Sequence, residues 1–320
     1  MKVCIYTNNH GSAAGIADIV SLLKCGAHDS GYSACISNQL MPGHCNVLIE
    51  HFVTDEELRT LQRCKTPGTR YVLVGTEIIT GDTFNAELNA RHPHYSNAAY
   101  WKTRFDGFMA ASRLADAVWV LSDLAVKPYQ TLLPDKPVRF LPHAHVNHFD
   151  LVHHRDEAHK DIEFYFSGNL TDSRREILAA LARKHSVVCN AQATPDYLRM
   201  DQMARAKVCL SMPLSPDNTL PSVSRMHFHL QNRNFLLHQA HPQASILDPY
   251  VLHAPPGDFV EWALAALAID NRRAIADGAL ARFRAELPMA RWMQPLLAEA
   301  TGHAPTRNLP SSTTTTAAAA

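Results

Sequence analysis

The stretch Asp161–Ser167 (DIEFYFS), followed by Gly168, decides the fold because it begins a second copy of a pattern that the chain has already completed once. The first copy opens with Met1–Thr7 (MKVCIYT) and closes with Val138–Leu141 (VRFL). Each copy alternates short apolar segments with longer segments of helical periodicity. This alternation predicts parallel strands joined by helical crossovers, and therefore two α/β domains that face a cleft.

The predicted strands of the first half are apolar without alternation, which is typical of strands buried on both faces of a parallel sheet. We expect them over Lys2–Thr7, Ala34–Ser37, Val47–Glu50, Arg70–Thr76, Ala117–Leu121 and Val138–Leu141. Helices are expected over Gly15–Lys24, Asp55–Cys64, Ala98–Ala115 and Leu124–Leu132. Thr54 and Glu57 form a capping-box pattern, which marks the start of the second helix.

The second half repeats the scheme with five predicted strands. They are expected over Glu163–Ser167, Ser186–Asn190, Val208–Ser211, Phe235–Gln239 and Tyr250–His253. Helices are expected over Asp172–Lys184, Asp196–Arg205, Ser222–Gln231, Pro256–Ala268 and Asn271–Glu286.

Residues 142–160 (PHAHVNHFDLVHHRDEAHK) break the alternation and are rich in histidine and polar residues, which indicates a solvated domain linker. We therefore expect an N-terminal domain over 1–150 and a C-terminal domain over 160–288. A last helix over 289–302 is expected to cross back toward the first domain. The low-complexity tail 310–320 is expected to be disordered.

The chain has 320 residues, and its 30 basic and 30 acidic residues cancel, so it lacks the basic excess of a nucleic-acid-binding protein. Its seven cysteines include no CxxC pair, which indicates buried free thiols in a reducing compartment. No apolar stretch is long enough to span a membrane, and no signal-peptide pattern is present. A cytoplasmic location without an integral membrane segment is predicted.

Three segments of the second half resemble the nucleotide-sugar domain of glycosyltransferases with the GT-B fold. These are Phe164–Leu181 (FYFSGNLTDSRREILAAL), Ala204–Met212 (ARAKVCLSM) and Leu220–Gln239 (LPSVSRMHFHLQNRNFLLHQ). Phe140–His143 (FLPH) is similar to the proline-bearing crossing between the two domains. The resemblance implies an α/β fold of two Rossmann-like domains, with an acceptor domain first and a nucleotide-sugar domain second.

The first candidate donor contacts are Ser167, Gly168, Asn169 and Arg174. A strand that ends in Ser-Gly lets the backbone approach an oxyanion, because glycine has no Cβ in the way. The helix that follows offers free N–H groups, and Arg174 in its first turn is placed to contact a phosphate. The alternative is an ordinary strand-to-helix turn with a surface arginine.

Ser222, Ser224 and Arg225 form the second donor candidate, at the start of another predicted helix. Backbone N–H groups, two hydroxyls and a guanidinium there would stabilise the charge that builds on a leaving nucleoside diphosphate. The alternative is a plain helix cap with a solvated arginine.

The loop after the first strand, with Asn9, His10 and Gly11, is expected to face the cleft from the acceptor side. His10 is a candidate general base for an acceptor hydroxyl, since imidazole titrates near neutral pH. Glu77 is its rival, and Asp123 is a further candidate. For His10 the alternative is a loop histidine without a role, among 19 histidines in the chain.

The linker histidines His143, His145, His148, His153 and His154 raise the question of a zinc site. No cysteine lies nearby and their spacing matches no zinc-ligand pattern, so a solvated linker is preferred. His143 is nevertheless a candidate to point into the cleft from the hinge.

The sequence departs from the family where retaining members place two glutamates eight residues apart: here Asp217, Ser222, Ser224 and Arg225 occupy that region. It also contains no DxD motif, so no metal bridge to a diphosphate is indicated. The resemblance therefore implies a metal-independent glycosyltransferase of the hexosyltransferase class, without a cofactor. Its donor would be a nucleoside diphosphate sugar and its acceptor a glycan, lipid or protein. A sugar-nucleotide epimerase of similar fold and a catalytically silent binding or scaffold protein are the alternatives.

Overall fold

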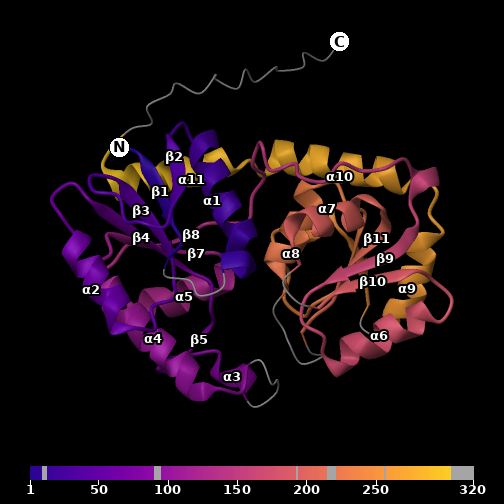
Figure 1. The fold of residues 1–320 in the computed structure, drawn as a ribbon, viewed down its shortest axis with the longest axis horizontal. Coiled ribbons are helices and arrows are strands. Elements are labelled where there is room, and N and C mark those ends of the chain that lie inside the picture. Colours follow the sequence, from indigo (N-terminus) through magenta and orange to yellow (C-terminus); the bar gives the residue numbers. More distant parts are fainter. Residues whose placement is uncertain (9–12, 90–94, 192–193, 215–220, 256, 304–320) are drawn as a thin grey trace, which may run out of the picture.

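The computed structural model describes residues 1–8, 13–89, 95–191, 194–214, 221–255 and 257–303, and contains two separate parallel sheets (Figure 1). The first sheet has the strand order β2-β1-β3-β4-β7-β8, and the second has the order β10-β9-β11-β12-β13. Every pairing within these two sheets is parallel. The predicted α/β class with two Rossmann-like halves is confirmed.

The first half contains the elements that the apolar pattern predicts, with small differences at their ends. Its sheet is built from β1 (Val3–Tyr6), β2 (Ala34–Ser37), β3 (Cys45–Ile49), β4 (Arg70–Gly75), β7 (Ala117–Val120) and β8 (Val138–Phe140). Its main helices are α1 (Ala17–Asp29), α2 (Asp55–Cys64), α4 (Ala98–Ser112) and α5 (Asp123–Leu132). A hairpin of β5 (Ile79–Thr80) and β6 (Thr83–Phe84), followed by the short α3 (Ala86–Asn89), was not predicted.

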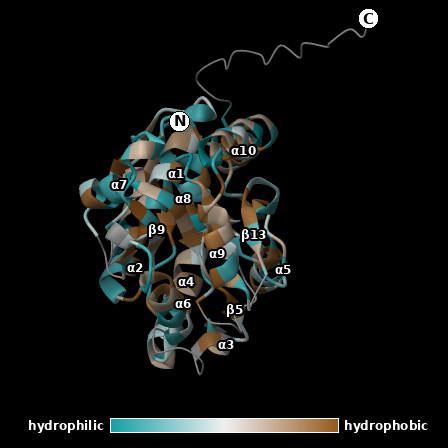
Figure 2. Cartoon of the chain, turned by 90° about the vertical axis from the view of Figure 1, so that its right-hand side faces the viewer, coloured by the Kyte–Doolittle hydropathy of each residue, from teal (hydrophilic) through white to brown (hydrophobic). Residues whose placement is uncertain are grey.

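The second half also follows the predicted order. Its strands are β9 (Ile162–Ser167), β10 (Val187–Asn190), β11 (Ala206–Ser211), β12 (Leu236–Gln239) and β13 (Leu252–Ala254). Its helices are α6 (Asp172–Ala182), α7 (Asp196–Ala204), α8 (Val223–Gln231), α9 (Phe259–Leu267), α10 (Arg272–Glu286) and α11 (Met289–Thr301). Figure 2 shows apolar residues gathered along the strand layer near β9, as expected for strands covered by helices.

Local capping fixes the start of α2. The Thr54 hydroxyl accepts a hydrogen bond from the Glu57 N–H at 3.3 Å, and the Glu57 carboxylate accepts one from the Thr54 N–H at 2.9 Å. This reciprocal pair is the predicted capping box, and it satisfies N–H groups that the first helical turn leaves open.

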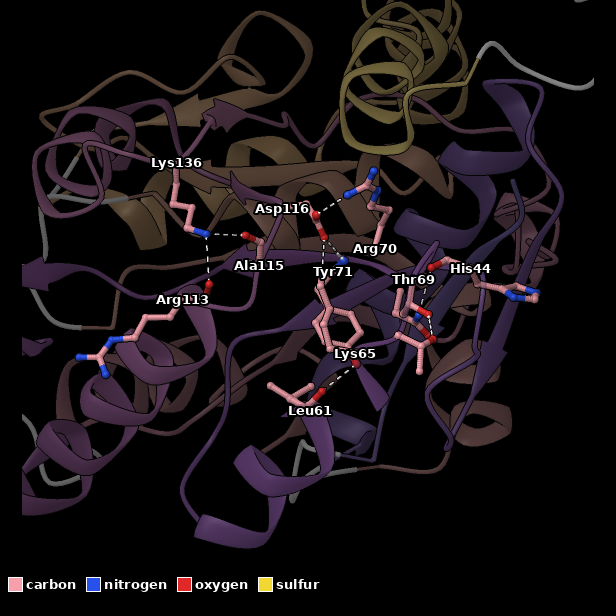
Figure 3. A network of polar contacts seen from close by, with 12 residues as sticks. His44, Leu61, Lys65, Thr69, Arg70, Tyr71, Arg113, Ala115, Asp116 and Lys136 are labelled. Carbon is pink, nitrogen blue, oxygen red and sulfur yellow. Dashed lines mark hydrogen bonds and ion pairs between the residues drawn. The ribbon is translucent and has the colours of Figure 1, made fainter. Parts of the chain in front are cut away.

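The amino ends of β4 and β7 are joined by a polar network around Asp116 (Figure 3). One carboxylate oxygen of Asp116 accepts hydrogen bonds from Lys65 Nζ at 2.5 Å and from the Tyr71 N–H at 2.7 Å. The other accepts one from Arg70 Nη1 at 2.9 Å. Burial alone would raise the pKa of Asp116, but these hydrogen bonds and the lysine charge outweigh it and hold the pKa below its ordinary value.

The prediction of a solvated linker over 142–160 is wrong for residues 142–146, which are all buried, whereas most of residues 147–159 are exposed. Ala144, Val146, Phe149 and Val152 are at most 1% exposed, and they belong to a core that both halves share. Polar groups of the linker backbone are satisfied from α8: the Gln231 side chain donates to the Val146 carbonyl at 2.7 Å. These apolar residues, spaced two or three positions apart within the histidine-rich stretch, were the signal for burial.

Helix α11 lies against the first half, and Figure 1 places it behind α1 and β1. Arg139 in β8 forms an ion pair with Glu299 in α11 at 2.6 Å. The Tyr32 hydroxyl donates a hydrogen bond to the His303 carbonyl at 2.8 Å. The tail 310–320 lies outside the described residues, and none of the described helices is both long and apolar enough to cross a bilayer.

Candidate functional site

A cavity of about 1400 Å³ lies between the two halves, lined from both sides by residues that follow the carboxyl ends of strands. Thr76 and Glu77 follow β4, Asp123 follows β7, and Gly168 follows β9. In parallel α/β sheets this edge is the place where ligands bind, because the loops there are free to vary while the strands hold them in position. The cavity is therefore the candidate functional site.

Two arginines, Arg174 buried and Arg225 half-buried, line the second-half wall and flank one aromatic ring. The guanidinium carbons of Arg174 in α6 and Arg225 in α8 lie 5.2 and 5.3 Å from the centre of the Phe166 ring in β9. Arg174 is only 3% exposed. It donates to the backbone carbonyls of Asn169, Met212 and Pro213 at 2.6, 2.7 and 2.8 Å.

These two positive charges have no balancing carboxylate: no Asp or Glu among the described residues forms an ion pair with Arg174 or Arg225. Burial, reinforced by the charge of Arg225, lowers the pKa of Arg174 to about 9. Burial likewise lowers the pKa of Arg225 to about 10. Two desolvated charges of the same sign destabilise each other unless an anion joins them. The wall is therefore suited to an anion with more than one charge.

Gly168 makes room for one of these arginines. Its φ is +138°, and a Cβ built on it would lie 2.4 Å from Nη2 of Arg225. Any larger residue would displace the guanidinium as well as strain the backbone. The Ser167-Gly168 turn thus leaves space for the Arg225 side chain at the end of β9. The sequence predicted only that the backbone of this turn could lie close to an oxyanion, and it did not predict this contact with Arg225.

The start of α8 brings a linker histidine to the same wall. Ser222 is the residue before the helix, and the Ser224 hydroxyl lies 2.9 Å from Nε2 of His143. Burial lowers the pKa of His143 to about 4, so the ring is neutral at neutral pH and shares a hydrogen bond with the serine. His143 lines the cavity as expected, but it is a buried, bonded group rather than a solvated linker histidine.

The first-half wall contains a buried triad of Glu50, Arg104 and Glu77. Nη2 of Arg104 contacts Glu50 Oε1 and lies 2.7 Å from Glu77 Oε1. The other Glu77 oxygen accepts a hydrogen bond from the Asn85 side chain at 2.8 Å. Of the three charged side chains, Glu77 is the one that lines the cavity. Sequence reasoning found Glu77 and missed its two partners, which lie 27 and 27 residues away on other elements.

An ion pair that sequence reasoning also missed joins the two walls. Arg199 in α7 donates to both carboxylate oxygens of Asp18 in α1, at 3.0 and 2.7 Å. Its guanidinium carbon lies 4.4 Å from the centre of the Phe228 ring. The two charged residues are 181 positions apart, so no local pattern connects them. Unlike Arg174 and Arg225, Arg199 has its charge neutralised by a carboxylate.

The remaining predicted residues have different outcomes. Asp123 lines the cavity as the first, exposed residue of α5, where its carboxylate accepts a hydrogen bond from the Leu124 N–H at 3.0 Å. Asn9, His10 and Gly11 lie outside the described residues, so the role of His10 stays a prediction. In the described part of the chain, no group of three or more His, Cys, Asp or Glu side chains is placed to hold a metal ion.

No family model and no curated protein matches this sequence. Among solved structures, the chain is similar to a DNA-modifying β-glucosyltransferase, with a TM-score of 0.52 and 12% identity over 95% of this chain and 100% of that one. It is also similar to AviGT4, a glycosyltransferase of avilamycin A biosynthesis, at a TM-score of 0.49 and 13% identity over 95% and 99% of the two chains. TarM gives a TM-score of 0.49 and 7% identity over 80% of this chain, which spans 54% of TarM.

Proposed function

The chain has the GT-B fold, and we propose that it is a glycosyltransferase that moves a sugar from a nucleoside diphosphate donor to an acceptor in the cleft. The observation that carries this proposal is the pair Arg174 and Arg225 at the carboxyl edge of the second sheet, which no carboxylate of the described residues neutralises. A diphosphate has the charge and the length to contact both guanidinium groups. Its negative charge would also offset the unfavourable desolvation of the pair.

In this proposal the second half is the nucleotide-sugar domain. Arg174 and Arg225 bind the diphosphate, while the turn at Ser167-Gly168-Asn169 and the start of α8 at Ser222 provide further hydrogen-bond donors near it. The same groups stabilise the negative charge that grows on the diphosphate as the glycosidic bond breaks. The arginines supply that stabilisation without a divalent ion, so we propose that transfer is independent of metal.

The first half is then the acceptor domain, with Glu77 and His10 as the candidate bases and Asp123 as a further cleft residue. The cavity of about 1400 Å³ supports a site for two substrates, since a single drug-sized ligand typically needs roughly 300–1000 Å³. All seven cysteines are free thiols in the structure, which supports a cytoplasmic location.

A thermal-shift screen against a panel of nucleoside diphosphate sugars tests the proposal. A ligand that binds only the folded chain at a hundred times its Kd raises stability by about 2.7 kcal/mol. We expect at least one sugar nucleotide to raise the melting temperature of the wild-type chain and of Arg175→Ala, a matched control whose arginine is exposed on α6. The same ligand should lose most of its effect on Arg225→Ala.

The absence of any shift across the panel in the wild-type chain would contradict the proposal. A shift without sugar transfer or hydrolysis in the presence of acceptors would indicate a silent binding protein. Conversion of the bound donor to an isomer would indicate an epimerase.

A further inference from the structure

The triad of Glu50, Arg104 and Glu77 is a feature that donor binding does not use. Glu50 has no exposed surface, and the Arg104 side chain is 6% exposed, so both charges are desolvated. Only the Glu77 side chain, 20% exposed, reaches the cavity. Two carboxylates share one guanidinium, so the ionised triad carries one net negative charge beside the cleft.

The elements around the triad hold it rigidly. The Thr76 N–H and hydroxyl both donate to Glu50 Oε2, at 2.8 and 2.6 Å. Arg104 also donates to the Glu50 backbone carbonyl at 3.2 Å, which ties α4 to the end of β3. The Tyr129 hydroxyl donates to the Glu77 carbonyl at 3.0 Å from α5. Glu77 therefore presents its carboxylate to the cavity from a fixed position.

Building on the proposed transferase reaction, we propose that Glu50 and Arg104 are positioning residues for Glu77. The three side chains act as one proton-accepting unit for the acceptor hydroxyl. In the step, the acceptor oxygen forms a bond to the anomeric carbon while its proton passes to the Glu77 carboxylate. The bond from that carbon to the diphosphate oxygen breaks, and its electron pair leaves on the diphosphate held by Arg174 and Arg225.

The electrostatics of the triad support its capacity for a proton. Burial raises the pKa of Glu50 to about 7; Arg104 and the Thr76 hydrogen bonds oppose this rise, and the Glu77 charge adds to it. The two carboxylates therefore compete for one guanidinium, and Glu50 takes up a proton near neutral pH. A proton that arrives at Glu77 relieves the repulsion between the two carboxylates.

Tyrosines are the other titratable groups that face the triad. Burial raises the pKa of Tyr129 well above its ordinary value, and the Glu50 and Glu77 charges add to the rise, so its hydroxyl stays a donor. Tyr100, in the same helix as Arg104, contributes to raising the pKa of that arginine. Nε2 of His51 lies 3.0 Å from the Tyr100 hydroxyl.

Tyr95 links the triad to the donor wall. Its pKa is raised to about 12, mainly by burial, with Glu77 adding to the rise while Arg104 and Arg174 oppose it. The Tyr95 hydroxyl therefore experiences charges from both walls of the cavity.

The coupling within the triad is measured by NMR titration of the full-length chain with ¹³C-labelled glutamate side chains across neutral pH. We expect one carboxyl signal with a midpoint near 7, which disappears in Glu50→Gln. Glu77→Gln should lower that midpoint by about one pH unit, the size at which two sites titrate as a pair. The matched control Glu176→Gln, exposed on α6, should leave it in place. A midpoint that does not move in Glu77→Gln would overturn the inference.

The catalytic consequence is read from the pH dependence of turnover with a donor that the wild-type chain consumes. Glu50→Gln should lower kcat about tenfold, a modest part of a general base's usual effect, and move the acidic limb of the profile while leaving the donor KM unchanged. A variant with an unchanged profile would overturn the positioning role. If the chain binds a donor but the Glu50 midpoint does not shift in Glu77→Gln, this inference alone is wrong. If the midpoint shifts but the chain turns over no donor, both this inference and the proposed function are wrong.

Discussion

The two ends of strand β4 place charge in opposite ways. At its amino end, the Asp116 carboxylate accepts hydrogen bonds from Lys65, Arg70 and a backbone N–H, and the surplus positive charge lies on side chains that are 26% and 46% exposed to solvent. Past its carboxyl end, Glu77 shares Arg104 with Glu50, and one negative charge is left over. The first arrangement favours the folded chain, and the second keeps an unbalanced charge at the cavity wall.

The comparison extends across the cleft, where Arg174 and Arg225 leave two positive charges unneutralised by any described carboxylate. Buried charges without opposite charges destabilise a fold, so their presence at one edge of the molecule needs a reason. A ligand that supplies the missing charge is such a reason, and it distinguishes a binding edge from a structural edge.

The largest expected effect is on ligand binding at the unbalanced edge. Arg225→Ala removes a charge-assisted phosphate contact worth about 1.5–3 kcal/mol, so calorimetry should show binding of a nucleoside diphosphate weakened roughly ten- to a hundredfold. The free energy of unfolding should change little, because the lost group is a half-buried cation that pairs with no carboxylate of the described residues. Equal affinities for Arg225→Ala and the Arg175→Ala control would remove Arg225 from the site.

At the amino end of β4, the loss of a charged side chain should change stability rather than ligand binding. Asp116→Ala leaves the Tyr71 N–H without its acceptor, and it removes the negative charge that Lys65 and Arg70 share. The loss should lower the free energy of unfolding by about 1–3 kcal/mol. Denaturant unfolding measures this loss, and nucleotide affinity should be unchanged. If Asp116→Ala instead weakened nucleotide binding at full stability, the assignment of this edge to structure would be wrong.

The contributions of Glu50 and Asp116 to stability should change with pH in opposite directions. The pKa of Glu50 is higher in the folded chain, so its contribution to stability is complete below the ordinary value of 4.5 and is lost as pH rises through about 7. The pKa of Asp116 is lower in the folded chain, so its contribution is present above its ordinary value and is lost as pH falls through the lowered one.

We therefore expect the free energy of unfolding of the wild-type chain to fall relative to that of Glu50→Gln as pH rises from mildly acidic to mildly basic. The fall should be on the order of 2 kcal/mol. The Asp116→Asn variant provides the matched comparison, with its largest relative change in acid. A stability difference for Glu50→Gln that is flat across neutral pH would show that Glu50 does not gain a proton on folding.

The smallest expected effect is that of chelation. If arginines balance the leaving diphosphate, EDTA should leave both donor binding and sugar transfer unchanged in an active preparation. Activity that disappears with EDTA and returns with magnesium or manganese would show that a metal ion, rather than the arginine pair, offsets the charge.

Local pattern predicted most of the fold. The ranges expected for β2 and α2 agree with the structure at both ends, since a short apolar run and a capping box depend on neighbouring residues alone. The expectation of strands buried on both faces fails for β2, an edge strand with Cys35 and Ile36 exposed. The same reasoning failed for residues 142–160, where histidines at a buried crossing look like polar residues at a surface. Their apolar neighbours pack into a core that comes from both halves of the chain.

The sequence by itself determined the two alternating halves, the turn at Gly168, and the placement of Arg174, Arg225 and Glu77 near the carboxyl ends of strands or the starts of helices. Tertiary structure alone decided how these charges are balanced. It placed both arginines against Phe166 with no ion pair to a carboxylate in the described part of the chain, paired Arg199 with Asp18, and joined Glu77 to Arg104 and Glu50. The physical reason is that burial and charge pairing arise between residues far apart in the chain, and such contacts leave no periodic trace in the sequence.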